Sequence, residues 1–265
     1  MSVAKPTLGV AVIARDEEAL LPDCLRSVSW ADDVLVLVDA ATSDGTREVA
    51  RSTGARVAER PFDTFAAQRA AALELASTEW LLFVDADERV APALRDEVRA
   101  TIAAPGASVG FWIPRRNVLL GRVVRYAGWS PDYQLRLLKV GHAQYQAWRV
   151  VHEVARLDGP AGYLREPLVH LNYRTLHEFV RKQERYSHLD AQRWLAAYGR
   201  PRLRALAGQP AREFWRRYVA LRGYREGVVG LVLSLLLAWY AGKTVWLAWR
   251  TTARRGTRRA TRTLS

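Results

Sequence analysis

Short apolar runs alternate with helical patterns over the first hundred residues. The runs are typical of strands buried on both faces of a parallel sheet, and they lie at residues 8–13, 33–38, 55–59 and 80–84. Helical patterns follow the first three runs, at residues 17–29, 46–53 and 65–76. Asp16, with Glu17 and Glu18 behind it, stands where an acid would cap the first helix. The alternation predicts an α/β fold, a doubly wound sheet with crossover connections.

The alternation ends after Pro105. Residues 110–172 give short mixed segments separated by Gly and Pro, which predict added strands, partly antiparallel, that complete a site. Residues 175–198 place apolar side chains at helical intervals and predict a long amphipathic helix. Residues 214–225 alternate aromatics with Arg, as an interfacial helix does. We therefore expect three parts: a catalytic domain over 1–172, amphipathic helices over 173–225, and an apolar helix with a basic tail over 226–265.

Residues 228–249 are almost entirely apolar. These 22 residues suffice to cross a bilayer core of ~30 Å at a rise of 1.5 Å per residue. Lys243 argues against a clean crossing, although it could snorkel, so an in-plane helix or a monotopic hairpin is an equal alternative. A buried core helix with a solvated tail is the third interpretation. An aromatic belt typical of a headgroup boundary is formed by Trp239, Tyr240, Trp246 and Trp249.

The charge of the chain is divided unevenly. Residues 1–110 contain 11 Lys and Arg against 18 Asp and Glu, whereas residues 111–265 contain 29 against 9. The basic residues flank the apolar segment, so we expect the partner to be an anionic membrane surface and not nucleic acid. Cys24 is the only cysteine, which excludes an intramolecular disulfide, and the N-terminus lacks a signal-peptide pattern. We expect the protein to lie at the cytoplasmic face of the inner membrane and to be attached as a peripheral or monotopic protein.

The segment WLLFVDADERV, residues 80–90, is an apolar run that ends in carboxylates. Ligands collect at the carboxyl ends of strands in open α/β sheets, and Asp85 with Asp87 could reach one Mg²⁺ or Mn²⁺ that bridges a diphosphate. The alternative is an ordinary acidic helix N-terminus, because acids there favour the helix dipole.

Other polar loop ends would gather along the same rim of the sheet. A nucleotide diphosphate could lie along this rim, where carboxylates accept hydrogen bonds from base or ribose and Arg faces base or phosphate. The residues concerned are Ala14, Arg15, Glu17, Asp39, Gln68, Arg69, Asp85 and Ala86.

Three ordered motifs resemble the inverting family 2 glycosyltransferases of the GT-A fold. VAVIARDEEALLPDCLRSV resembles the family's opening strand and helix, VDAATSDGT resembles its D-x-x-S-x-D-G-T turn, and VDADE resembles its metal-binding D-x-D. The resemblance implies a GT-A type Rossmann-like sheet, mostly parallel and flanked by helices, with Asp85 toward the ribose and Asp87 toward the metal and diphosphate. Asp16 departs from the Asn of many members, so a side-chain amide contact would be lost.

A second resemblance covers about residues 129–190. SPDYQLRLLKVG, VHE, PLVHLNY and ERYS look like the branch of lipopolysaccharide-core β-1,4-glucosyltransferases. It implies a lipid-linked saccharide as the acceptor.

Inversion requires one base that deprotonates the acceptor hydroxyl across the sugar from the metal. We rank Glu153 first, because it sits where the resembled branch has its His-Glu pair, followed by Asp132 and His152. Arg136 could bind the diphosphate or be a surface Arg at a strand edge. His170 could be a further metal ligand or a structural histidine.

These features predict transfer of a hexose, most plausibly glucose from UDP-glucose, to a lipid-linked saccharide. A polyprenyl phosphate acceptor is the alternative within the class. A nucleotidyltransferase is a second class, but it would ordinarily show a Gly-rich phosphate loop after the first strand, and ARDEEALL has no Gly. A non-catalytic nucleotide-binding membrane protein is the third possibility.

Overall fold

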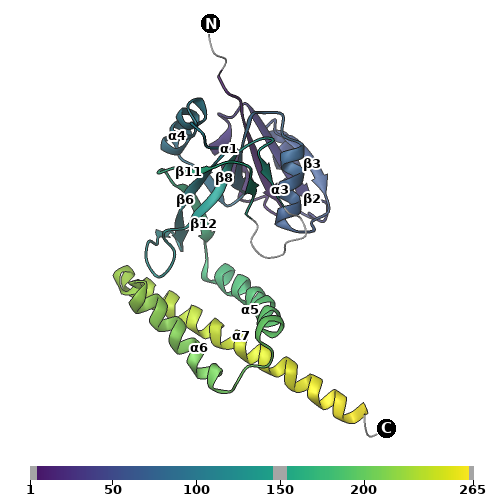
Figure 1. The fold of residues 1–265 in the computed structure, drawn as a ribbon, viewed down its shortest axis with the longest axis vertical. Coiled ribbons are helices and arrows are strands. Elements are labelled where there is room, and N and C mark those ends of the chain that lie inside the picture. The colour runs from purple at the N-terminus through teal and green to yellow at the C-terminus, as the bar shows by residue number, and fades with distance from the viewer. Residues whose placement is uncertain (1–4, 146–153, 263–265) are drawn as a thin grey trace. The chain divides into compact units, whose positions relative to one another are not determined.

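The chain forms two compact units. The computed structural model describes residues 5–145 and 154–262, with backbone alone for 253–262. The first unit, here called the sheet unit, comprises the residues up to Arg116 together with Asp132–Leu171, and the remainder forms the helical unit. Figure 1 shows most of the sheet unit in purple to teal and the helices of the helical unit in green and yellow. Residues 173–225 and 226–265, which the sequence suggested as separate parts, belong to one unit, which also includes residues 117–131.

Four parallel strands form the first half of the sheet. They are ordered β3-β2-β1-β4. In their register Ala14 pairs with Val38, and Ile13 pairs with Asp85, so the carboxyl ends of three strands meet at one rim. The strands are β1 (Leu8–Ala14), β2 (Asp33–Asp39), β3 (Arg56–Arg60) and β4 (Trp80–Asp85).

The second half of the sheet is largely antiparallel, as the mixed segments predicted. After β4 the order continues β8-β6-β12-β5, and β7 and β11 pair with β6. A separate pair joins β9 (Ala143–Gln144) to β10 (Arg156–Leu157). The remaining strands are β5 (Glu88–Val90), β6 (Gly110–Leu119), β7 (Arg122–Val123), β8 (Tyr133–Lys139), β11 (Ala161–Tyr163) and β12 (Leu168–Tyr173).

Helices cover both faces of the parallel strands. Alternate side chains of β1 enter different cores: Val10 and Val12 pack into one with α1, α2 and α4, while Ala11 packs into the other with α3. This three-layer arrangement is the predicted α/β class. The helices are α1 (Leu21–Val28), α2 (Thr46–Ser52), α3 (Phe65–Glu74) and α4 (Pro92–Ala103).

The first helix begins later than predicted. Residues 17–20 form a turn, α1 starts at Leu21, and no side chain caps it. Asp16 adopts a left-handed φ of 53°, which Asp tolerates, and its carboxylate accepts hydrogen bonds from Ser43 instead. The expectation that Asp16 caps this helix was therefore wrong, because a contact to a distant loop engages the carboxylate.

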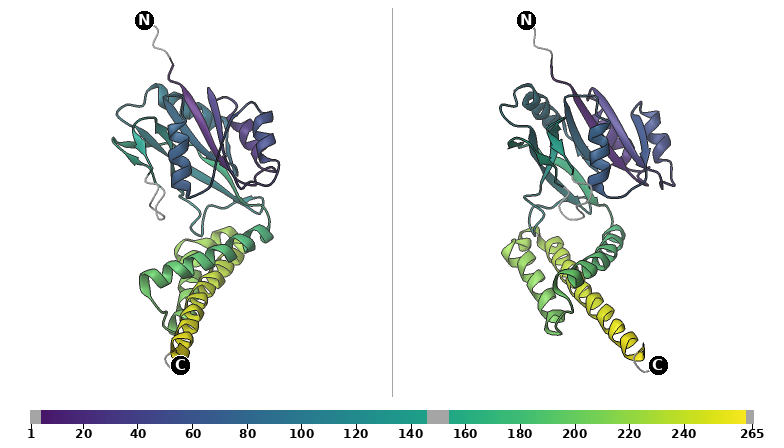
Figure 2. Two further views of the ribbon diagram at one scale, coloured as in Figure 1. Left: turned by 90° about the vertical axis from the view of Figure 1, so that its right-hand side faces the viewer. Right: turned by 45° about the vertical axis from the view of Figure 1, so that its right-hand side comes forward.

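The helical unit holds three long helices. These are α5 (Leu176–Tyr198), α6 (Arg204–Trp215) and α7 (Gly227–Arg262), the last seen as the long yellow helix in both views of Figure 2. The single interfacial helix expected over 214–225 was wrong: α6 ends in a π-turn at Arg216–Ala220, and a 3-10 turn, Gly223–Glu226, follows. The break falls at Arg222, whose φ of 55° is left-handed.

The helix α7 packs on the other two and is only partly covered. Lys243 forms an ion pair with Glu184 of α5, and Gly242 lies against Pro210 of α6. Residues Gly223–Thr252 are long and apolar enough to cross a membrane, and a third of the apolar window is buried. The predicted apolar helix is therefore present. Its length and composition fit a crossing and an in-plane helix alike.

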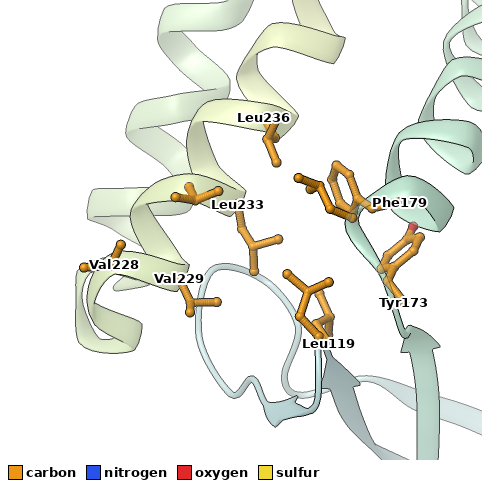
Figure 3. A pocket seen from close by; sticks show the side chains of 10 residues that line it. Leu119, Tyr173, Phe179, Val228, Val229, Leu233 and Leu236 are labelled. Atoms are coloured by element: carbon orange, nitrogen blue, oxygen red, sulfur yellow. The ribbon is translucent and has the colours of Figure 1, made fainter.

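An apolar pocket of about 200 Å³ lies within the helical unit (Figure 3). Leu119, Tyr173 and Phe179 line one side of the pocket. Leu233 and Leu236 of α7 line the other side. The aromatic rings of Tyr173 and Phe179 meet edge to face at 4.9 Å. This pocket continues the core that joins the start of α5 to α7.

Gly230 is required by a close backbone approach within the helical unit. A Cβ there would overlap the carbonyl oxygen of Gly223. We expect Gly230→Ala to lower the free energy of unfolding by about 1–3 kcal/mol, since the backbone must shift. Gly208→Ala is the matched control, because a Cβ at Gly208 meets nothing within 4 Å, and it should stabilise α6 by about 0.5–1 kcal/mol. Thermal unfolding of the full chain in detergent measures both, and equal midpoints for the two variants would contradict the packing.

Candidate functional site

Two loops at the rim of the parallel strands are tied together by hydrogen bonds. Asp16 accepts from the Ser43 amide at 2.8 Å, and Glu18 accepts from the Gly45 amide at 3.0 Å. The Glu17 amide donates to Thr46 Oγ1 at 2.8 Å. The candidate residue Glu17 therefore stabilises the loop that follows β1 through its backbone amide. Ala14, the last residue of β1, is buried.

Asp39 is the last residue of β2, and its carboxylate is buried. Its Oδ1 accepts from the amides of Ala41 at 3.0 Å and Phe62 at 3.3 Å, and its Oδ2 lies 3.1 Å from an Arg15 guanidinium nitrogen. Gln68 of α3 is also buried and donates through Nε2 to the Pro61 carbonyl at 2.9 Å. Among the described residues, Gln68 Oε1 is buried without a hydrogen-bond donor, and the Arg15 ion pair is the contact of the buried Asp39 Oδ2. Buried acceptors of this kind normally have a partner, so Gln68 Oε1 is available to a ligand, and Asp39 Oδ2 could accept a ligand's donor beside Arg15.

Asp85, at the end of β4, is surrounded by three arginines. Its Oδ2 forms ion pairs with Arg136 and, at 2.9 Å, with Arg115, while its Oδ1 lies 3.6 Å from Arg69. Glu88 is fully buried behind this group, where it binds Arg115 Nε at 2.6 Å and accepts from the Asp85 amide at 2.8 Å. The cluster thus joins β4 and β5 to β6, β8 and α3.

The cluster keeps Asp85 ionised. Burial acts to raise the pKa of Asp85, but the guanidinium groups of Arg136, Arg69 and Arg115 outweigh it and hold that pKa well below its ordinary value. Burial likewise acts to lower the pKa of Arg136, and the charges of Asp85 and Glu88 raise it instead. A carboxylate with so many cationic partners has little charge left for a metal ion.

Asp87 lies two residues beyond Asp85 and meets His170. The Asp87 Oδ2 and His170 Nε2 atoms are 3.4 Å apart. Pairing of β12 with β5 sets this contact, because His170 pairs with Glu88 and the Leu171 amide donates to the Asp87 carbonyl at 2.8 Å. Within residues 5–145 and 154–262, no group of three or more His, Cys, Asp or Glu side chains is arranged to hold a metal ion. Among the described residues, Asp87 and His170 are two side chains that could contribute to a metal site.

One candidate base is described by the structure. Asp132 accepts from Gln134 Nε2 at 2.7 Å and lies 3.9 Å from Arg115, which places it at the edge of the arginine cluster. His152 and Glu153 lie outside the described residues.

Arg115 was not predicted as a site residue, and Glu88, predicted only as one of the carboxylates at the end of the strand, binds arginine here. Two consecutive arginines within the apolar segment GFWIPRRN were the available signal, since a charged residue in a covered strand needs a partner. Ala86 is buried between the two aspartates, and its carbonyl accepts from Arg89 at 2.8 Å.

Cys24 of α1 packs behind the site. Its Sγ lies 3.5 Å from the Asp85 carbonyl oxygen, and burial raises the pKa of its thiol well above the ordinary value. The thiol is therefore a packing group and not a nucleophile.

A two-sided parallel sheet whose strand ends gather acids and arginines defines an α/β protein of the GT-A type. Residues 9–171 match glycosyl transferase family 2, and the chain belongs to this family and is a glycosyltransferase. The predicted family, fold class and enzyme class are thereby confirmed.

Relatives and solved structures extend the comparison. Over 250 residues, 90% of each chain, the protein is 30% identical to the lipopolysaccharide core biosynthesis glycosyltransferase LpsC of Rhizobium meliloti (strain 1021). It is similar to glucosyl-3-phosphoglycerate synthase from Mycobacterium tuberculosis in complex with Mn²⁺, uridine diphosphate and glucosyl-3-phosphoglycerate, at 18% identity and a TM-score of 0.43 over 66% of this chain and 75% of that one. For residues 1–349 of TarS from S. aureus the identity is 14% and the TM-score 0.45, over 94% of this chain and 92% of that one.

The lowered pKa of Asp85 makes stability depend on pH. Because the folded state binds this proton less readily than the unfolded chain, the stabilisation is present above the ordinary carboxyl pKa of about 3.9 and is lost as pH falls below it. Asp85→Asn should lower the free energy of unfolding at neutral pH by about 2 kcal/mol. This loss is smaller than the loss on breaking a fully buried ion pair, because the Asp85 side chain is 30% exposed. The difference from the parent should shrink near pH 3.

Thermal unfolding of the full chain at the two pH values measures this effect. Asp23→Asn, which removes an exposed carboxylate, is the control and should change stability little at either pH. If Asp85→Asn lowered the stability of the protein equally at both pH values, the ion-pair account would be contradicted.

Proposed function

We propose that the protein transfers a hexose, with inversion, from a nucleotide diphosphate donor to a saccharide of the lipopolysaccharide core. UDP-glucose is the first donor to test. The observation that carries the proposal is the meeting of the Asp87–His170 pair with the arginine cluster of Asp85 at the carboxyl end of β4. The acceptor class is supported by the similarity to LpsC, which extends over 90% of both chains.

The nucleoside end of the donor fits the rim at Asp39. The buried Oδ2 of Asp39 can accept a hydrogen bond from a base or ribose, and Arg15 beside it can face the base. Gln68 Oε1 offers a second buried acceptor. The residues therefore suit a nucleoside, whose amide and hydroxyl groups are donors.

The diphosphate fits the arginine cluster. Arg136 has two buried nitrogens, Nε and Nη1, without a hydrogen-bond partner among the described residues, and Arg69 and Arg115 lie on the same carboxylate. Arginine binds phosphate through paired N–H groups, so the cluster is suited to two linked phosphates. Asp85 would hold these guanidinium groups in place.

Asp87 and His170 would hold a divalent cation, which would supply positive charge for the donor's diphosphate. We assign Asp87 and His170 as its protein ligands and withdraw Asp85 from that role, because its charge is already balanced by arginines. A carboxylate and an imidazole suit Mn²⁺ better than Mg²⁺, which prefers oxygen ligands alone. Such an ion would neutralise the charge that develops on the departing diphosphate.

The reaction requires a base on the acceptor side. Its task is to take the proton of the acceptor hydroxyl as that oxygen attacks the anomeric carbon, while the bond to the nucleotide diphosphate breaks on the opposite face. We propose Glu153, with His152 beside it in the chain, and keep Asp132 as the alternative because it borders the arginine cluster.

The helical unit is suited to a membrane surface. Exposed apolar side chains of α7 recur at spacings of three, four and seven residues and so occupy one face of the helix, while α5 and α6 pack on it elsewhere. These residues are Val228, Val232, Leu235, Trp239 and Trp246. One apolar face favours a helix that lies in the interface over one that crosses the bilayer. We place the protein on the cytoplasmic face of the inner membrane.

Family membership favours a glycosyltransferase over the other classes considered. The match to family 2 over residues 9–171 supports this class against a nucleotidyltransferase or a non-catalytic nucleotide-binding protein. Transfer to a polyprenyl phosphate stays an alternative within the class, and the two functions differ in the acceptor that the enzyme uses. A panel of nucleotide sugars, assayed with Mn²⁺ against lipopolysaccharide-core and polyprenyl-phosphate acceptors, separates the two.

Asp87→Asn tests the metal and donor site. We expect kcat/KM for donor turnover to fall by about a hundredfold or more, with a higher Mn²⁺ concentration at half-maximal rate, because a ligand charge is lost. Asp23→Asn removes an exposed carboxylate and should leave turnover unchanged. Unchanged turnover in Asp87→Asn, or no turnover of any nucleotide sugar by the parent, would overturn the proposed mechanism.

Glu153→Gln and Asp132→Asn distinguish the two base assignments. Loss of a general base lowers kcat by about 10²–10⁴-fold, so we expect this loss in Glu153→Gln, with donor binding retained. Asp132→Asn should have the smaller effect on kcat. Steady-state kinetics and nucleotide binding by calorimetry measure both variants, and the opposite ranking would assign the base to Asp132.

A further inference from the structure

A pocket with four arginines lies in the helical unit, where α5 turns into α6. Its volume is about 550 Å³, within the range of small-ligand sites. Arg200 and Arg202 of the turn line it, together with Arg204 and Arg212 of α6. Trp194 and Tyr198, from the last turns of α5, form an aromatic wall.

The positive charge of this pocket is not balanced by ion pairs within the described part of the chain. None of its four arginines has an ion pair with another residue in the described part of the chain, and no acid lines the pocket. The acids of α5 and α6 are engaged elsewhere: Glu178 with Arg174, Glu184 with Lys243, Asp190 with Arg193, and Glu213 with Arg216 and Arg217. Gathered guanidinium groups repel one another, so this pocket favours an anionic occupant.

Apolar and aromatic groups adjoin the arginines. Leu203, between two of the arginines in sequence, is 66% exposed, and Tyr198 is 76% exposed. The guanidinium of Arg200 lies 5.8 Å from the ring centroid of Trp249 on α7. Exposed Leu and Tyr next to arginines, with a half-buried Trp beside them, are typical of protein surfaces at the level of lipid headgroups.

We propose that this arginine pocket binds the phosphate group of an anionic membrane lipid. The guanidinium groups would take the phosphate oxygens, and Leu203 and Tyr198 would contact the glycerol and upper acyl region. The site lies outside the donor machinery, which belongs to the sheet unit. The proposal rests on the membrane location in the proposed function, and it gives that location a specific headgroup contact in addition to diffuse charge.

A charge-matched pair of variants tests the pocket. Arg202→Gln with Arg204→Gln removes two of its arginines, and Arg122→Gln with Arg181→Gln removes two exposed arginines of the same unit that lie outside it. Co-sedimentation of the full chain is measured with phosphatidylcholine vesicles that do or do not contain one third phosphatidylglycerol. We expect the phosphatidylglycerol-dependent binding to fall by about thirtyfold in the pocket variant, the loss of two arginine contacts at an anionic surface, and to change little in the control. Equal losses in both variants would overturn the proposal and assign binding to diffuse charge.

Soluble ligands separate a lipid from a free phosphate. Dihexanoyl-phosphatidylglycerol should raise the thermal midpoint of the parent and of the control variant but not of the pocket variant, and inorganic phosphate at equal concentration should raise it less. An equal response to inorganic phosphate would overturn the lipid assignment in favour of a general phosphate site, such as one for a phosphorylated acceptor. No response to either ligand would overturn both.

Donor hydrolysis distinguishes failure of this proposal from failure of the proposed function. The pocket variant should hydrolyse the donor at the rate of the parent, because its arginines lie outside the sheet unit. Loss of vesicle binding with normal hydrolysis supports the lipid site alone. A parent without hydrolysis would overturn the proposed function, while the vesicle comparison would still decide the pocket.

Discussion

The buried carboxylate of Glu88 is the contact on which the candidate site depends. It binds Arg115 from β6, lies 3.6 Å from Arg136 of β8 and accepts the amide of Asp85 from β4. A buried carboxylate without cationic partners would be too costly to desolvate, so its burial requires both arginines to be present. Once they are in place, Asp85 pairs with both, Asp132 lies 3.9 Å from Arg115, and the rim of the sheet acquires a fixed set of paired guanidinium and carboxylate groups.

The turn between β4 and β5 gives Asp85 and Asp87 different surroundings. Asp85 and Asp87 would point in one direction on a regular strand, but the turn between β4 and β5 separates their surroundings. Asp85 faces guanidinium groups, whereas Asp87 faces the imidazole of His170. Two carboxylates separated by one residue therefore have different partners, and the difference arises from which neighbouring strand each one meets.

The parallel part of the fold was predictable because its signals are local. Apolar runs at β1, β2 and β4 end one residue before the strands do, and the order of these ends along the chain placed Asp39, Gln68 and Asp85 on one rim. Arg115 was missed because the register of β6 with β8 depends on residues far away in sequence. The late start of α1 also has a long-range origin, since Asp16 bonds to a distant loop. The break at Arg222 is local, because a left-handed residue interrupts an aromatic pattern that looked helical.

The burial of Cys24 has a consequence for how the molecule can be studied. Its thiol is fully covered, rests against the backbone of Asp85 and stays protonated at physiological pH. Oxidants and alkylating reagents therefore have no reactive sulfur to attack near the donor rim. A cysteine introduced on the surface would be the single labelled position, so fluorescent or spin probes can be attached without removing the native residue.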